Sequence, residues 1–168
     1  MAFKVEKLEI PDLLLITPEL RHDDRGFFVE IYKSTDFATY GINKNFLQVN
    51  HSKSKKDVIR GLHYQLEPAG QGKLLRALVG KIFDVAVDIR AGSPSYGQWV
   101  GLTLKAQEEQ LLYIPEGFAH GFCALTESAA LEYFSTDVYS PANERGIIWN
   151  DPVIGIKWPF ANPILSKK

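Results

Sequence analysis

The chain has 168 residues, 45% of them hydrophobic and 23% charged, with a formal net charge of -1. These values are typical of one globular domain, here residues 1–168, and the near-neutral charge argues against attraction to nucleic acid or a membrane surface. No apolar run approaches the roughly 20 residues of a membrane span, the N-terminus is too charged for a signal peptide, and one cysteine, Cys123, favours a reducing, cytoplasmic location.

Strand signals recur along the whole chain as short β-branched or aromatic runs bounded by Gly, Pro, Asn or Ser. The predicted strands are residues 27–32, 46–52, 57–64, 73–79, 81–89, 98–104, 109–115, 121–125 and 129–139. Only residues 34–41, with Ser34 as cap and Gly41 as closing residue, and a weaker turn at 104–110 are predicted to be helical. Many strands with few helices predict an all-β sandwich or barrel, of which the jelly roll is one form.

The alternation of side chains along a strand indicates which residues can share a pocket. Arg60 and His63 have opposite parity, so both can face one site only if Gly61 bulges or twists the strand. Tyr133 and Tyr139 have the same parity and are expected to point the same way. Two further groups are expected to share a face: Gln48 with Asn50, and Asp84 with Ala86 and Asp88 on a polar face of the strand at 81–89.

The histidines raise a metal site as the first hypothesis. His22 and His51 lie among charged and polar residues typical of solvated segments, whereas His63 and His120 lie on separate strands that can converge inside a barrel. Catalytic zinc usually takes three protein ligands, but the next inward position after His63 holds Gln65, a weak ligand. The residues therefore favour no metal without excluding one.

Proton chemistry is the alternative reading of the same residues. A neutral imidazole with a pKa near 6.5 can accept a proton, and a phenol on the opposite side can return one. Tyr133 and Tyr139 are candidate phenols, and Lys73 and Arg60 are candidate cations for stabilising an enolate oxygen. Cys123, among Phe, Ala and Leu, is interpreted as a core residue rather than a nucleophile.

Six long segments carry a resemblance over almost the whole chain. In order they are DDRGFFVE, QVNHSKSKKDVIRGLHYQ, GKLLRALVGKIFDVAVDIRAGSPSYGQWVG, LYIPEGFAHGF, EYFSTDVYSP and WNDPVIGIKWP. In order and spacing the chain resembles the dTDP-4-dehydrorhamnose 3,5-epimerase family. The resemblance implies a cupin-type double-stranded β-helix, or jelly roll, with a few short helices. It also implies a homodimer, without metal or organic cofactor, that inverts both carbons flanking the ketone of a dTDP-linked 4-keto-6-deoxyhexose on the route to L-rhamnose.

The resemblance also assigns roles to individual residues. His63 matches the base that removes each α-proton, and Tyr133 matches the acid that reprotonates from the other face. Tyr139 matches a ring that stacks on thymine. Lys73 and His120 match two substrate-contacting positions, of which Lys73 is the better placed to hold the developing enolate. The full set of matched substrate-binding positions is Arg25, Glu30, Gln48, Val49, Asn50, Arg60, Lys73, His120, Tyr139, Glu144 and Lys168.

The chain departs from the family pattern at three places. Val49 stands where Asp is common, and Phe134 stands where Lys often follows the acid tyrosine. A Ser-x-Lys-Asp stretch in the family provides an Asp that hydrogen-bonds the base histidine, and the sequence ends at Lys168, where that Asp would follow. We expect that the natural protein continues with Asp or that an internal carboxylate, Asp84, partners His63.

Three alternative functions remain open from the sequence. Relatives of the family act at a single carbon or on other nucleotide sugars. A metal-dependent cupin dioxygenase or isomerase would use the same fold, and so would a cupin that only binds a nucleotide or sugar.

Overall fold

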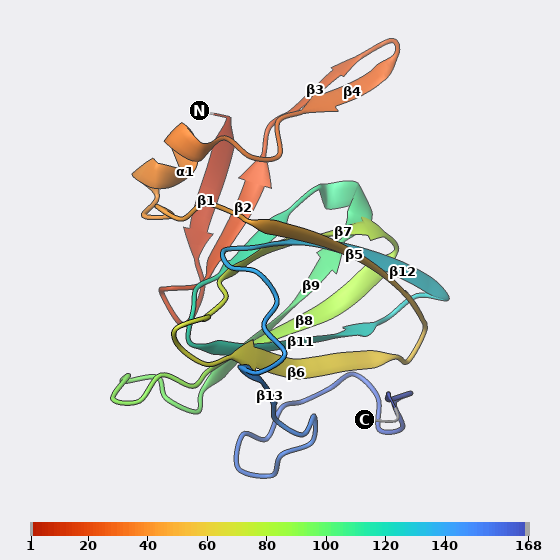
Figure 1. Ribbon diagram of the computed structural model, residues 1–168. Helices are drawn as coiled ribbons and strands as arrows, with labels where there is room; N and C mark the ends of the chain where they lie inside the picture. The colour runs from red at the N-terminus through yellow and green to blue at the C-terminus, as the bar shows by residue number, and fades with distance from the viewer. Residues whose placement is uncertain (1, 167–168) are drawn as a thin grey trace.

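Two antiparallel sheets face one another in the computed structural model, which describes residues 2–166 (Figure 1). The first sheet has the order β1 (Phe3–Lys7), β2 (Leu14–Pro18), β10 (Leu111–Ile114), β7 (Lys73–Val79), β12 (Ser128–Ser135) and β5 (Gln48–Lys55). The second has the order β13 (Glu144–Gly146), β6 (Ile59–Gln65), β11 (Phe118–Ala124), β8 (Lys81–Asp88) and β9 (Trp99–Lys105). Successive strands along the chain often lie in opposite sheets, and the predicted all-β jelly roll is confirmed.

A separate hairpin of β3 (Leu20–Asp23) and β4 (Gly26–Val29) projects away from the two sheets (Figure 1). Four strands were not predicted: β1, β2, β3 and β13. Two predicted strands end early, because β4 stops at Val29 and β12 stops at Ser135. The strand parity expected for Tyr139 therefore does not apply, since residues 136–143 form a loop outside the ladder.

The short helix α1 (Ser34–Thr39) confirms the helical segment but not its predicted cap. Lys33 is the N-cap residue, and no side chain caps the helix. The C-terminal end follows the prediction, because Gly41 has φ +88 and the Ile42 N–H donates to the Phe37 carbonyl at 3.1 Å, a Schellman arrangement. The 3₁₀ helix η1 (Ala106–Glu108) confirms the weaker turn. Within residues 2–166, neither helix has the length and apolar character needed to cross a bilayer.

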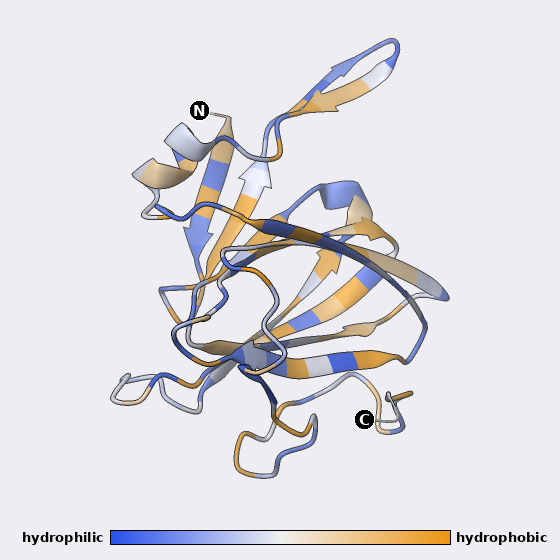
Figure 2. Ribbon diagram, viewed as in Figure 1, coloured by the Kyte–Doolittle hydropathy of each residue, from blue (hydrophilic) through white to orange (hydrophobic). Residues whose placement is uncertain are grey.

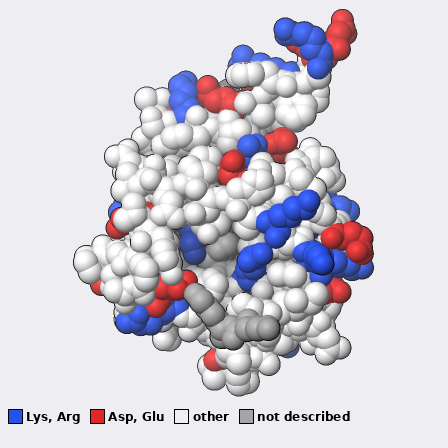
Figure 3. Space-filling view, turned by 45° about the vertical axis from the view of Figure 1, so that its right-hand side comes forward, with Lys and Arg blue, Asp and Glu red and all other residues white. Residues whose placement is uncertain are grey.

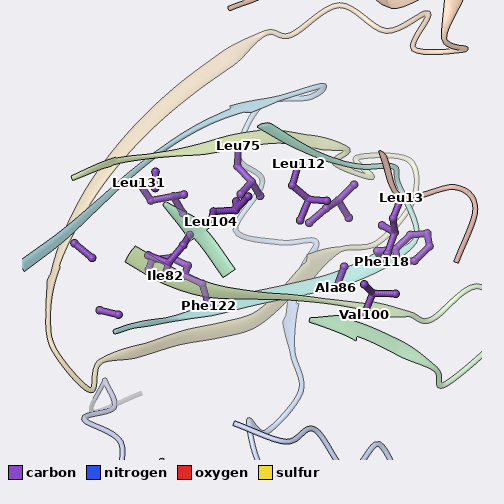
Figure 4. Close-up of a cluster of buried hydrophobic side chains, with 14 of the residues drawn as sticks. Leu13, Leu75, Ile82, Ala86, Val100, Leu104, Leu112, Phe118, Phe122 and Leu131 are labelled. Carbon is purple, nitrogen blue, oxygen red and sulfur yellow. The ribbon is translucent and has the colours of Figure 1, made fainter. Parts of the chain in front are cut away.

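The main hydrophobic core fills the space between the two sheets (Figure 4). Hydrophobic and hydrophilic residues alternate along several strands, as Figure 2 shows, so each strand offers one face to this core. A second cluster lies on the outer side of the first sheet, where Leu74 and Tyr113 pack with Phe37 of α1. A third covers the outer side of the second sheet, where Val85 and Leu62 pack with Ile156 of the C-terminal segment.

The predicted bulge at Gly61 is present. Gly61 has φ +123, and the register between β6 and β11 shifts there, so that His120 pairs with His63 while Phe122 pairs with Arg60. Cross-strand partners share a face, and Phe122 belongs to the inner core, so Arg60 and His63 both lie on the side of the second sheet that faces the first, where both remain exposed to solvent. The parity conflict in the sequence is therefore resolved by one glycine.

We predict that Gly61→Ala lowers the free energy of unfolding by about 2–5 kcal/mol, measured by urea denaturation. The added Cβ would lie 2.5 Å from Gly121 Cα and 2.7 Å from the His120 carbonyl oxygen, in addition to the strain of positive φ. Gly92→Ala is the matched control, because Gly92 has φ +80 but no atom within 4 Å of the position that a Cβ would occupy. It should cost about 1–2 kcal/mol. Equal effects of the two substitutions would contradict the close strand contact.

Candidate active site

A buried carboxylate–imidazole pair lies between the sheets. Asp84 on β8 is fully buried, and its two oxygens lie 2.9 Å and 3.0 Å from Nε2 of the buried His120 on β11. Since an ionised carboxylate only accepts, His120 donates its Nε2–H to it. The predicted polar face of β8 is thus turned inward, and Asp84, which the sequence offered as a partner for His63, is paired with His120.

Lys73 lies at the start of β7 and reaches across the interior toward β6. Its ammonium donates to the His63 carbonyl oxygen at 3.4 Å, and the side chain is 8% exposed. Burial lowers the pKa of Lys73 to about 8, while the negative charges of Asp84 and Glu144 act in the opposite direction. The amine therefore carries its charge at neutral pH and loses it as the pH rises through about 8.

Tyr133 approaches the same space from β12 of the first sheet. It pairs in register with Leu75 and with Asn50, and it packs at the margin of the inner core. Burial raises the pKa of the Tyr133 phenol, the positive charge of Arg60 lowers it, and Glu144 raises it further. The phenol therefore lies within electrostatic range of both charged residues and is protonated at neutral pH.

The open edge of the barrel is lined by polar residues of β5. Gln48 and Asn50 share a face as predicted, that face is turned inward, and the Gln48 amide donates to Asn50 Oδ1 at 3.0 Å. Arg60 joins the two sheets here, because its Nε donates to Ser54 Oγ at 3.0 Å and its Nη2 donates to the Lys53 carbonyl at 3.3 Å. In Figure 3, Lys and Arg side chains lie beside a hollow on this part of the molecule, which favours an anionic ligand.

Tyr139 and Glu144 complete this end of the barrel from the loop at 136–143 and from β13. The Tyr139 hydroxyl donates to Glu144 Oε2 at 2.9 Å, and its backbone N–H donates to Gln48 Oε1 at 2.7 Å. The Tyr139 side chain is nevertheless 48% exposed. Gln65, considered in the sequence only as a weak metal ligand, is buried beside this loop and bonds to its backbone.

The structure thus places most of the predicted site residues along the space between the two sheets and at its open edge: Gln48, Asn50, Arg60, His63, Lys73, His120, Tyr133, Tyr139 and Glu144. Arg25 and Glu30 do not join them, because Arg25 lies in the turn of the projecting hairpin, where it pairs with Asp23 at 2.6 Å, and Glu30 follows the last strand of that hairpin. Lys168 lies outside the described residues. A separate surface hollow in the C-terminal segment, lined by Trp149, Trp158 and Phe160 among others, contains none of the predicted residues.

Val49 points away from the site, on the outer face of the first sheet. It pairs in register with Phe134, so the two departures from the family pattern lie directly opposite one another. Phe134 packs edge-on against Phe46 with ring centroids 6.2 Å apart. An apolar cross-strand pair therefore occupies these two positions, and neither side chain lies inside the barrel.

The described residues also include the side chains that metal or thiol chemistry would use. Within residues 2–166, no group of three or more His, Cys, Asp or Glu side chains is arranged to hold a metal ion. Cys123 is fully buried, as interpreted from the sequence, and burial raises the pKa of its thiol to about 12. A thiol with so high a pKa carries almost no thiolate at neutral pH and makes a poor nucleophile.

Comparison with known proteins agrees with the resemblance seen in the sequence. The dTDP-4-dehydrorhamnose 3,5-epimerase family model matches residues 7–168. The chain is 53% identical over 165 residues to a dTDP-4-dehydrorhamnose 3,5-epimerase of Shigella flexneri, covering 98% of this chain and 91% of the relative. It is 40% identical over 166 residues to a dTDP-4-dehydrorhamnose 3-epimerase of Streptomyces niveus, covering 98% of this chain and 80% of the relative.

A solved structure gives the same result for the fold. The dTDP-6-deoxy-D-glucose-3,5-epimerase of Legionella pneumophila, in complex with dTDP-4-keto-L-rhamnose, superposes with a TM-score of 0.94 at 43% identity, covering 99% of this chain and 89% of the other. Sequence identity at this level over nearly the full length, together with the shared fold and the match to the family model, shows that this chain belongs to the dTDP-4-dehydrorhamnose 3,5-epimerase family of isomerases.

Proposed function

We propose that this isomerase epimerises a dTDP-linked 4-keto-6-deoxyhexose at both carbons flanking the ketone, converting dTDP-4-dehydro-6-deoxyglucose to dTDP-4-dehydrorhamnose. The observation that carries the proposal is the approach of His63 and Tyr133 from opposite sheets toward one polar interior that also holds Lys73. A base and an acid on opposite sides of a substrate are what inversion of a carbon requires.

In this mechanism His63 removes the proton from a carbon next to the ketone, and the electron pair moves onto the ketone oxygen to form an enolate. The Lys73 ammonium, charged at neutral pH, stabilises that oxygen. Tyr133 then donates its phenolic proton to the opposite face of the same carbon. Exchange with solvent removes the proton from His63 and restores the one lost by Tyr133, so the enzyme returns to its starting state before the second carbon reacts.

The remaining polar residues serve binding. His120, held by Asp84, presents an oriented imidazole beside His63, and Arg60 offers a guanidinium to the diphosphate. The exposed Tyr139 ring provides a platform on which thymine stacks.

We predict that the enzyme, incubated with dTDP-4-keto-6-deoxyglucose in heavy water, incorporates deuterium at both carbons flanking the ketone, as measured by NMR. His63→Asn should slow this exchange about 10²–10⁴-fold by removing the base. Tyr133→Phe should keep exchange but lose inversion, with dTDP affinity unchanged. Tyr64→Phe is the matched control, because Tyr64 neighbours His63 but packs on the outer face of β6. Exchange that persists in His63→Asn would show that another residue is the base.

A single-carbon epimerase is the second candidate function, favoured by the similarity to the Streptomyces niveus 3-epimerase. The same heavy-water experiment separates the two candidates, because a single-carbon enzyme labels one carbon only. A cupin that only binds nucleotide sugars would label neither carbon.

We predict that activity survives prolonged treatment with a chelator, because the proposed proton transfers use only side chains of the protein. The measurement is turnover after dialysis against the chelator, with elemental analysis of the dialysed protein as the control for metal removal. A stoichiometric metal whose removal abolishes turnover would favour a metal-dependent cupin instead.

We further propose a cytoplasmic homodimer in which the hairpin of each chain reaches the neighbour's site. Phe27 and Phe28 on the hairpin are 52% and 66% exposed, and an isolated two-stranded hairpin is only marginally stable in water. A second copy of the chain packed on the hairpin would cover both rings and stabilise the hairpin. Arg25 and Glu30 would then bind the substrate of the partner. A reducing cytoplasm suits the buried free thiol of Cys123.

The dimer has a complementation test. Arg25→Ala and His63→Asn should each be inactive alone, but co-refolded chains should recover about a quarter of wild-type activity, because half the dimers are mixed and each mixed dimer has one intact site. Light scattering should give twice the chain mass of 18.9 kDa. A fully active monomer, or mixtures that recover nothing although mixed dimers form, would contradict the shared site.

A further inference from the structure

Three glutamine side chains from three different parts of the fold hold the backbone of residues 137–140, which we call the strap. Gln71, in the loop before β7, donates its amide to the Asp137 carbonyl at 2.7 Å. Gln65, at the end of β6, donates to the Val138 carbonyl at 3.2 Å and accepts from the Ser140 N–H at 2.7 Å. Gln48 on β5 accepts from the Tyr139 N–H at 2.7 Å.

The strap lies outside both sheets, so these side-chain bonds replace the ladder that would otherwise fix it. Gln65 is 8% exposed and also donates to the Ala69 carbonyl at 2.7 Å, which anchors the amide on the opposite side. An amide that donates and accepts simultaneously can match both polar groups of a peptide backbone, which no carboxylate or ammonium can do. The contact of residue 65 with the Val138 carbonyl and the Ser140 N–H therefore favours an amide side chain at this position.

The strap carries Tyr139, whose ring is held at both ends but open on its surface. The backbone N–H is bound to Gln48, the hydroxyl is bound to Glu144, and the side chain remains 48% exposed. A ring fixed before the ligand arrives loses less conformational freedom on binding, and this preorganisation increases affinity.

We infer that Gln65 and Gln71 are positioning residues for nucleotide binding, which act by fixing the strap so that Tyr139 is presented as a rigid platform for the thymine base. This inference rests on the proposed function, since it takes Tyr139 as the stacking ring. It adds two residues that act on the nucleotide through the strap.

The test is a double-mutant cycle on dTDP affinity, measured by calorimetry. Gln65→Met keeps the side-chain volume but removes three hydrogen bonds, and it should weaken dTDP binding about tenfold while leaving kcat at saturating substrate within about twofold. In a Tyr139→Ala background the same Gln65→Met change should have no further effect, because there is no ring left to position. The inference would be overturned if the fold-changes in the Kd for dTDP multiply in the double variant, or if Gln65→Met leaves this Kd unchanged.

Two controls keep the outcome clear. If Gln65→Met does not fold, Gln71→Met, which removes only one bond from a less buried side chain, should weaken dTDP about threefold and show the same absence of effect in the Tyr139→Ala background. Gln110→Met removes a comparable amide bond, to Thr17 Oγ1 at 3.2 Å, away from the strap, and should leave dTDP affinity unchanged. A wild-type protein that binds no dTDP would instead overturn the proposed function, which separates the two failures.

Discussion

The close approach of β6 and β11 at Gly61 and Gly121 is the constraint on which the site depends. A Cβ on Gly121 would lie 2.8 Å from the Arg60 carbonyl oxygen, so both strands need glycine at their crossing. The shift of register at this point turns Arg60 inward while keeping His63 opposite His120. Without this shift the strand would be regular, and one of the two side chains would lie on the outer face. The Arg60 guanidinium and the His63 imidazole would then lie on opposite faces of the sheet.

The interior of the barrel has an apolar part and a polar part. The apolar part increases the free energy of unfolding, and the buried polar part decreases it. Lys73, Asp84 and His120 are each less than a tenth exposed. Burying charges is unfavourable unless they are compensated, and here the Asp84 carboxylate is paired with His120 while Lys73 lies within range of two carboxylates. The lowered pKa of Lys73 shows that compensation is incomplete. Perturbed pKa values of this kind are typical of functional sites.

The sequence predicted the strand-rich fold, because most strands are short apolar runs punctuated by turn residues. It missed β1, which does alternate apolar and charged residues but is short and contains Lys and Glu, which are depleted in strands, and it missed β13, which is three residues within a polar stretch. Side-chain parity predicted that Gln48 and Asn50 share a face and that Gly61 must bulge or twist its strand. It failed for Tyr139, because nothing in the local pattern indicates that β12 ends at Ser135. The resemblance named more candidate site residues than residue chemistry did. The pairing of Asp84 with His120 depends on strands distant in the chain, and strand register cannot be read from one sequence.

The cross-strand pairing of Val49 with Phe134 makes two departures that are far apart in the sequence direct neighbours on the outer face of the first sheet. An Asp introduced at Val49 alone would place a carboxylate opposite an aromatic ring that packs against Phe46, and a Lys introduced at Phe134 alone would leave its ammonium facing an aliphatic side chain. Val49 is 55% exposed, so water would solvate a carboxylate at this position, and its coupling to position 134 would be limited to the modest free energy of an exposed cross-strand pair. Such an exchange would change the outer surface of the first sheet and leave the side chains inside the barrel as they are.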